Sequence, residues 1–214
     1  MTEIAIYVEG GGNTADQKAE LRRGFDGLLE NLKSRARVKR LGWRLVPSGG
    51  RKQTYDAFIN ALRNNSDTLN ILLVDSETVI QIHNFNNVQD AIIRVAHLTQ
   101  QGWNLSTANS VAVHLMVQCM EAWIVSDADA LEEFYGQKFI RNALPSRDNL
   151  EEEPKQDVYN KLARATRETQ KGEYGKIKHA SQLLQKINRA RVEQRCPRFA
   201  IFTQWLQQTI DTMG

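Results

Sequence analysis

Carboxylates follow two apolar segments of the chain and point to a metal site. "IAIYV" (residues 4–8) leads into Glu9 and three glycines, and "ILLV" (residues 71–74) leads into Asp75 and Glu77. Three carboxylates at close range repel one another unless some are protonated or a cation lies between them. Mg²⁺ and Mn²⁺ favour oxygen ligands of this kind. Glu9, Asp75 and Glu77 are therefore candidate metal ligands if the fold brings the two segments together.

The order of the predicted strands and helices indicates that the fold brings these two segments together. Short apolar runs predict four strands, at residues 3–9, 42–47, 68–74 and 110–118. Apolar residues at helical spacing fall between them, at residues 14–36, 53–65 and 87–100. Strands that alternate with single helices form parallel sheets with right-handed crossovers. We expect a three-layer α/β/α, Rossmann-like fold with a mainly parallel four-strand sheet.

The pattern changes after residue 136. Helices are predicted near residues 155–169, 179–187, 190–195 and 198–209, after a polar stretch that contains prolines. We interpret residues 1–136 as the α/β domain and residues 137–214 as a C-terminal helical cap. The two are expected to form one compact unit.

Functional sites of open parallel sheets gather outside the carboxyl ends of the strands. Glu9 and Asp75 end two predicted strands, and Glu77 can reach the same side if the chain stays extended. Glu121 follows the fourth strand; it either binds or orients a metal, or stabilises a helix N-terminus as an ordinary acid. The glycines after Glu9 let the backbone turn and leave room for a phosphate. The alternative is that these acids are surface helix caps.

Composition and motif spacing argue against a zinc- or disulfide-stabilised domain, a P-loop protein, a secreted protein and a membrane protein. Lys and Arg number 28 against 25 Asp and Glu, and the two cysteines have no zinc-ligand or disulfide spacing. The chain has no P-loop spacing, no signal-peptide pattern and no apolar run near the ~18 residues of a membrane span. We expect a cytoplasmic protein with no membrane partner. Arg51 and Lys52, after the second strand, are candidates for contact with a nucleic-acid backbone.

The motifs "YVEGGG" (residues 7–12) and "LLVDSE" (residues 72–77) resemble those of Toprim domains, with Glu77 where an Asp is usual. Such domains occur in topoisomerases, primases and nucleases of the overcoming-lysogenization-defect type. "CMEAW", "YGKIKH" and "CPRF" further resemble a small Toprim-like family of unknown function. Its relatives include RloB-like proteins, which are often encoded beside ABC-type ATPases in prokaryotic defence loci.

The resemblance implies a Mg²⁺- or Mn²⁺-dependent phosphodiesterase that cleaves DNA or RNA. Glu9, Asp75, Glu77 and Glu121 are then the expected ligands and catalytic acids, with Glu9 as ligand or general base. Lys176 matches the family's lysine after a tyrosine and is expected to stabilise charge on the phosphate. Lys178 and His179 are expected to help bind the nucleic acid.

The expected protein is thus a nuclease-like effector in antiviral defence, with an ABC- or SMC-type ATPase as partner. A homodimer is also possible under this resemblance. The alternative is a non-catalytic Toprim-like subunit that regulates or docks, which the change from Asp to Glu at position 77 favours. A topoisomerase- or primase-like enzyme ranks last, because the chain lacks room for the extra domains.

Overall fold

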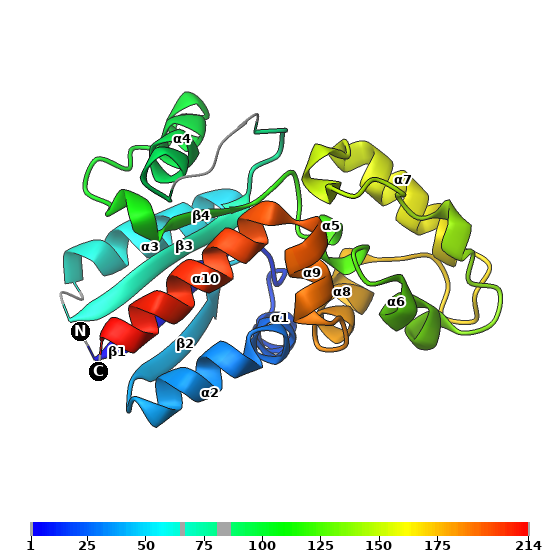
Figure 1. The fold of residues 1–214 in the computed structure, drawn as a ribbon, viewed down its shortest axis with the longest axis horizontal. Helices are drawn as coiled ribbons and strands as arrows, with labels where there is room; N and C mark the ends of the chain where they lie inside the picture. The colour runs from blue at the N-terminus through cyan, green and yellow to red at the C-terminus, as the bar shows by residue number, and fades with distance from the viewer. Residues whose placement is uncertain (1, 65–66, 81–86, 214) are drawn as a thin grey trace.

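A sheet of four parallel strands forms the centre of the molecule in the computed structural model, which describes residues 2–64, 67–80 and 87–213 (Figure 1). The strand order is β2-β1-β3-β4. The strands are β1 (Glu3–Val8), β2 (Gly42–Pro47), β3 (Thr68–Asp75) and β4 (Val113–Met116). β1 and β3 are neighbours, and Val8 pairs with Leu73 at the carboxyl end. The predicted parallel four-strand sheet is confirmed.

Helices cover both faces of this sheet. One face carries α1 (Ala15–Leu28), α2 (Glu30–Val38) and the C-terminal α10 (Pro197–Thr212), and the other carries α3 (Arg51–Asn64) and α4 (Asn87–Gln100) (Figure 1). Each face buries its own apolar core. β1 and β3 are buried on both faces, which explains why their sequences are apolar throughout.

One helix predicted at residues 14–36 is two helices, with a break at Leu29. The start is as expected: Thr14 and Gln17 form a capping box. The break follows two glycines in the last turns of α1, Gly24 and Gly27. A Cβ on Gly24 would lie 2.8 Å from the Ser181 carbonyl oxygen, so the glycines admit a neighbouring helix at close range while weakening their own. The spacing of apolar residues in α1 does not by itself indicate that the helix containing Ser181 packs against it.

The chain after residue 120 supplies short helices around the carboxyl edge of the sheet. They are α5 (Glu121–Ile124), α6 (Ala128–Tyr135), α7 (Lys155–Thr166), α8 (Lys176–Leu184) and α9 (Arg189–Arg195). In the described residues, single turns of 3-10 helix occur at Ser110–Ala112, Arg141–Ala143 and Leu150–Glu152. α8 packs on α1, and α10 runs along β4 and α2 (Figure 1). Among the described residues, no helix combines the length and the apolar character needed to cross a bilayer.

Candidate metal centre

Three carboxylates from two neighbouring strands meet at the carboxyl edge of the sheet. Glu9 directly follows β1, Asp75 is the last residue of β3, and Glu77 lies two residues beyond it. Each offers one oxygen atom, and these three atoms lie within 4.8 Å of one another. The structure thus brings together the three acids that follow the two apolar segments. We call them the acidic triad.

The backbone after β3 directs Glu77 toward the other two acids. Glu77 has a φ of 68°, in the left-handed region that side-chain-bearing residues rarely adopt. Its N–H donates to the carbonyl oxygen of Gln118 at 3.1 Å, and Gln118 itself has a φ of 56°. The Gln118 N–H in turn donates to Ser76 Oγ at 2.8 Å. Such backbone conformations cost about 1–3 kcal/mol each and persist where surrounding contacts hold them.

The glycines after Glu9 fix the other side of the triad. Gly10 and Gly49 exchange two backbone hydrogen bonds, of 2.7 and 2.9 Å, which tie this turn to the end of β2. Gly12 has a φ of 62°, and a Cβ there would lie 2.1 Å from Gln17 Oε1. Gln17 Oε1 is held by the capping box of α1. The turn therefore requires glycine, and it positions Glu9 rigidly.

Each acid of the triad has one basic partner. Arg51 Nη1 lies 3.3 Å from Glu9 Oε2 and donates to the Asp75 carbonyl oxygen at 2.6 Å. Lys176 Nζ lies 3.5 Å from Asp75 Oδ2. Lys155 Nζ lies 2.6 Å from Glu77 Oε2. These three cations come from α3, α8 and α7, so the site is assembled from helices on both sides of the sheet edge.

Burial has the largest effect on the pKa of two of these acids, Asp75 and Glu9. It raises the pKa of Asp75 to about 7, against the opposing charge of Lys176. It also raises the pKa of Glu9, against Arg51. Burial lowers the pKa of Lys176, but the charges of Asp75 and Glu121 outweigh it and raise that pKa above its ordinary value. Lys176 is therefore positively charged at neutral pH, while Asp75 lies near its titration midpoint.

Glu121 lies beside the triad but is held by other groups. It is fully buried; the Tyr159 hydroxyl donates to Oε2 at 2.8 Å and the Tyr174 hydroxyl to Oε1 at 3.0 Å. Lys176 Nζ is 3.8 Å from Oε1. Both carboxylate oxygens are thus engaged by tyrosines, and this arrangement orients Lys176 toward Asp75. The carboxylate is not among the three that converge.

The other residues predicted to contact nucleic acid, Lys52, Lys178 and His179, each bond to groups outside the triad. Lys52 is exposed and pairs with Asp56 along α3 at 2.6 Å. Lys178 donates to the carbonyl oxygen of Lys171 at 3.1 Å at the surface. His179 is buried, and its Nδ1 accepts from the Gly175 N–H at 3.1 Å and lies 3.2 Å from the Tyr135 hydroxyl. Burial lowers the pKa of His179, so it packs as a neutral ring and is not placed to touch a phosphate.

Sequence reasoning missed Lys155, Gln118 and the two tyrosines around Glu121. Lys155 sits in an acidic stretch, 78 positions from its partner Glu77, and no spacing rule connects them. Gln118 has a weak signal, since it ends the fourth apolar run just before "CMEAW". Its side-chain NH₂ donates to the Glu151 carbonyl oxygen at 3.0 Å, and its Oε1 accepts from the Lys155 N–H at 3.0 Å. Gln118 thereby places Lys155 next to the triad.

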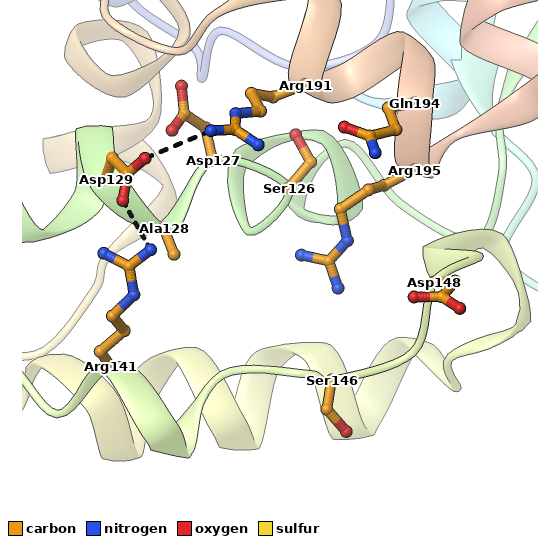
Figure 2. A pocket seen from close by; sticks show the side chains of 10 residues that line it. All are labelled: Ser126, Asp127, Ala128, Asp129, Arg141, Ser146, Asp148, Arg191, Gln194 and Arg195. Carbon is orange, nitrogen blue, oxygen red and sulfur yellow. Dashed lines mark ion pairs between the residues drawn. The ribbon is translucent and has the colours of Figure 1, made fainter.

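A cavity of about 350 Å³ lies between α6, α9 and the chain near Ser146 (Figure 2). Its arginines are already engaged. Arg141 and Arg191 both pair with Asp129, and Arg195 donates to the Pro145 carbonyl oxygen at 3.0 Å. Burial lowers the pKa of Arg195, and three aspartates balance the three arginines. Its charges are thus used within the protein, and the acidic triad remains the better candidate for chemistry.

Comparisons with known proteins assign this chain to a family but do not indicate a function. The family model described as "Domain of unknown function (DUF4276)" matches residues 8–207. No curated protein and no solved structure matches the chain. The matched residues include the whole acidic triad and its three basic partners. Because the match spans nearly the entire sequence, the chain belongs to the DUF4276 family.

Proposed function

We propose that this protein is a divalent-metal-dependent phosphodiesterase of Toprim-like type, related to RloB-like proteins and to nucleases of the overcoming-lysogenization-defect type. The observation that carries the proposal is the convergence of Glu9, Asp75 and Glu77 within 4.8 Å. Mg²⁺ binds six oxygens at about 2.1 Å, so its ligand oxygens lie roughly 3–4 Å apart. The triad supplies only oxygen donors, and from within 4.8 Å they would need to approach one another by about an ångström to reach that spacing.

The charge balance of the site supports the same proposal. When all are ionised, four carboxylates exceed the three basic side chains by one negative charge. With a divalent cation bound the sign reverses, and the site then attracts a phosphodiester. Burial raises the pKa of Asp75 despite the charge of Lys176, so a bound cation would stabilise its ionised form further.

The residues of the site then have separate tasks in hydrolysis. Asp75 and Glu77, with Glu9 as third ligand or as general base, would hold a divalent ion, which would supply Lewis acidity toward the phosphoryl group and lower the pKa of the attacking water. Lys176, kept charged by Asp75 and Glu121, stabilises the negative charge that develops on the phosphoryl group. Where it serves as general base instead of ligand, Glu9 accepts the proton of the attacking water. The oxygen of that water joins phosphorus, the bond to one ester oxygen breaks, and the departing oxygen takes a proton from solvent.

A cleavage assay on labelled tRNA, plasmid DNA and single-stranded DNA tests the proposal. Wild type and Asp75→Asn are compared with Mn²⁺, with Mg²⁺ and with EDTA. We expect cutting that requires metal and disappears in Asp75→Asn. The amide keeps the hydrogen bond from the Met120 N–H, which is 2.9 Å long, so the variant should remain folded. Activity retained in a well-folded Asp75→Asn would refute the assignment.

A non-catalytic docking or regulatory subunit is the second candidate. The observation that favours it is that every acid of the triad already has a basic partner, as in a purely structural ion-pair network. It predicts no cleavage of any substrate, no metal binding by calorimetry, and capture of a partner that is unaffected by Glu9→Gln. An ABC- or SMC-type ATPase acting with the protein in antiviral defence is part of the proposal under either function.

A further inference from the structure

The side chain of Lys18, on α1, lies against the turn that follows Glu9. A Cβ on Gly11 would lie 3.3 Å from Lys18 Cγ, and a Cβ on Gly49 would lie 4.0 Å from Lys18 Cε. Gly49 exchanges two backbone hydrogen bonds with Gly10, the residue after Glu9. Lys18 therefore reaches the carboxyl edge of the sheet, on the side of the acidic triad that Glu9 occupies.

Arg22 continues this line one turn farther along α1. Residues four apart share one face of a helix and are about 6 Å apart along its axis. Arg22 Nε donates to the Leu45 carbonyl oxygen at 3.0 Å, which holds the guanidinium against β2. β2 is the outer strand of the sheet, next to β1. Lys18 and Arg22 together form what we call the basic strip, which leads away from the triad along β2.

Neither cation of the basic strip pairs with a carboxylate of the described residues. The Lys18 ammonium has no hydrogen-bond or ion-pair partner among them, and the Arg22 guanidinium has only the Leu45 carbonyl oxygen. Asp16 and Glu20 are each two positions from Lys18, so they do not face it across the helix. The strip therefore carries two positive charges that the surrounding part of the protein leaves for a ligand.

Other lysines of this edge already have acceptors within the protein. Lys155 and Lys176 pair with acids of the triad. Lys52 pairs with an aspartate of its own helix, and Lys178 bonds to a backbone carbonyl oxygen. An anion that approaches one of these lysines competes with a bond that is already made. At the basic strip the ligand displaces only water from Lys18.

We propose that the basic strip binds phosphates that flank the scissile one in an extended nucleic-acid strand. The inference rests on the proposed function and adds a substrate class to it, a polynucleotide instead of an isolated diester. Contacts of Lys and Arg with phosphates supply affinity without sequence choice. A strand bound in this way passes from the triad over the glycine turn and along α1.

The first test is binding of a labelled single strand of about twelve nucleotides, followed by fluorescence anisotropy at several salt concentrations. Asp75→Asn is the background, because it should leave the strand uncut, and titrations are run with Mn²⁺ and with EDTA. Lys18→Gln or Arg22→Gln should each lower the slope of log affinity against log salt by about 0.7 and weaken binding about fivefold near 0.1 M salt.

Two further variants control for charge and for folding. Arg63→Gln also removes one exposed positive charge, but in the last turn of α3, where the chain approaches the start of β3 at the opposite edge of the sheet. It should leave the slope unchanged. Arg22→Lys keeps the charge and should bind within about twofold of the background. An unchanged slope in Lys18→Gln, an equal fall in Arg63→Gln, or no binding of the strand overturns the inference.

Cleavage kinetics without the Asp75→Asn change separate this inference from the proposed function. Lys18→Gln should lower kcat/KM about fivefold on the long strand and leave it unchanged on a dinucleotide, which has no flanking phosphate. Losses that are equal on both substrates, or absent on both, overturn the basic strip while the phosphodiesterase stands. If nothing is cut, the proposed function fails, and the salt slopes still decide whether the strip binds a strand.

Discussion

The ammonium nitrogen of Lys155 lies 2.6 Å from Glu77 Oε2 and joins the start of α7 to the turn after β3. This ion pair brings a residue from the last third of the chain into the acidic triad. A metal ion bound at the acidic triad would share the Glu77 carboxylate with Lys155. Lys155 and the ion would therefore compete for Glu77, and this competition can be measured.

Replacing Lys155 with Met should strengthen metal binding in the absence of substrate. The change removes both a partner of Glu77 and a positive charge close to the ion. Because partly exposed ion pairs contribute about 0–1 kcal/mol, we expect a gain of roughly threefold to fivefold in Mn²⁺ affinity by calorimetry. Lys161→Met on the same helix, which removes a partner of Glu153, is the control. Unchanged or weaker affinity in Lys155→Met would show that the ion does not use Glu77.

Metal affinity should rise with pH up to about 7 and then level off. Burial raises the pKa of Asp75 to about 7, so below that pH a proton occupies a group that the ion needs. We expect an affinity change of about tenfold per pH unit below the pKa, with one proton released per ion bound. Titrations of Mn²⁺ across this range measure both quantities. A flat profile would mean that Asp75 is not a ligand.

The buried Asp75 carboxyl should reduce the stability of the metal-free protein as the pH rises from about 4 to about 7, relative to Asp75→Asn. Burial raises the folded-state pKa of Asp75 and of Glu151 to about 7, above the ordinary values of 3.8 and 4.5. These two carboxyls then hold more protons in the folded than in the unfolded state, so they lower the free energy of unfolding as the pH rises. His114 and His179, whose pKa burial lowers, act in the opposite direction in both proteins. Urea unfolding with EDTA at several pH values checks this. Asp75→Asn should show a shallower fall, and an equally steep one would contradict the shift at Asp75.

Glu77→Asn should separate backbone strain from metal binding. Asn tolerates the positive φ of this position better than Glu does, but it removes a charged ligand. We expect at least a tenfold loss of Mn²⁺ affinity, with the free energy of unfolding within about 0.5 kcal/mol of wild type or above it. A large loss of stability would mean that the pair with Lys155 is structural and would favour the docking function.

Tyr174→Phe should destabilise the protein without changing metal affinity. Glu121 is fully buried, and loss of one hydroxyl donor leaves its carboxylate less satisfied, at a cost of about 1–3 kcal/mol in urea unfolding. Tyr55→Phe removes a surface hydroxyl bonded to the Asn104 carbonyl oxygen and should change stability by less than about 0.5 kcal/mol. A marked change in Mn²⁺ affinity for Tyr174→Phe would return Glu121 to the set of ligands.

Local sequence patterns were enough to predict the strands that carry the site and the acids at their ends. Apolar runs followed by Glu9 and Asp75 predict strands whose ends carry acids, and the alternation of strands and helices predicts that those ends share one edge. The glycines after Glu9 predict a tight turn there. Each of these inferences depends on periods and propensities that act within a few residues, so the sequence alone contains them.

Only the tertiary structure decided what surrounds the acids. The position of Glu77 depends on a hydrogen bond from its N–H to Gln118, and Lys155 reaches it from 78 positions away. The burial that raises the pKa of Asp75 and the tyrosines that bond to Glu121 likewise arise from helices that pack together from distant parts of the chain. Such contacts have no period in the sequence, because they are set by the packing of whole elements against one another.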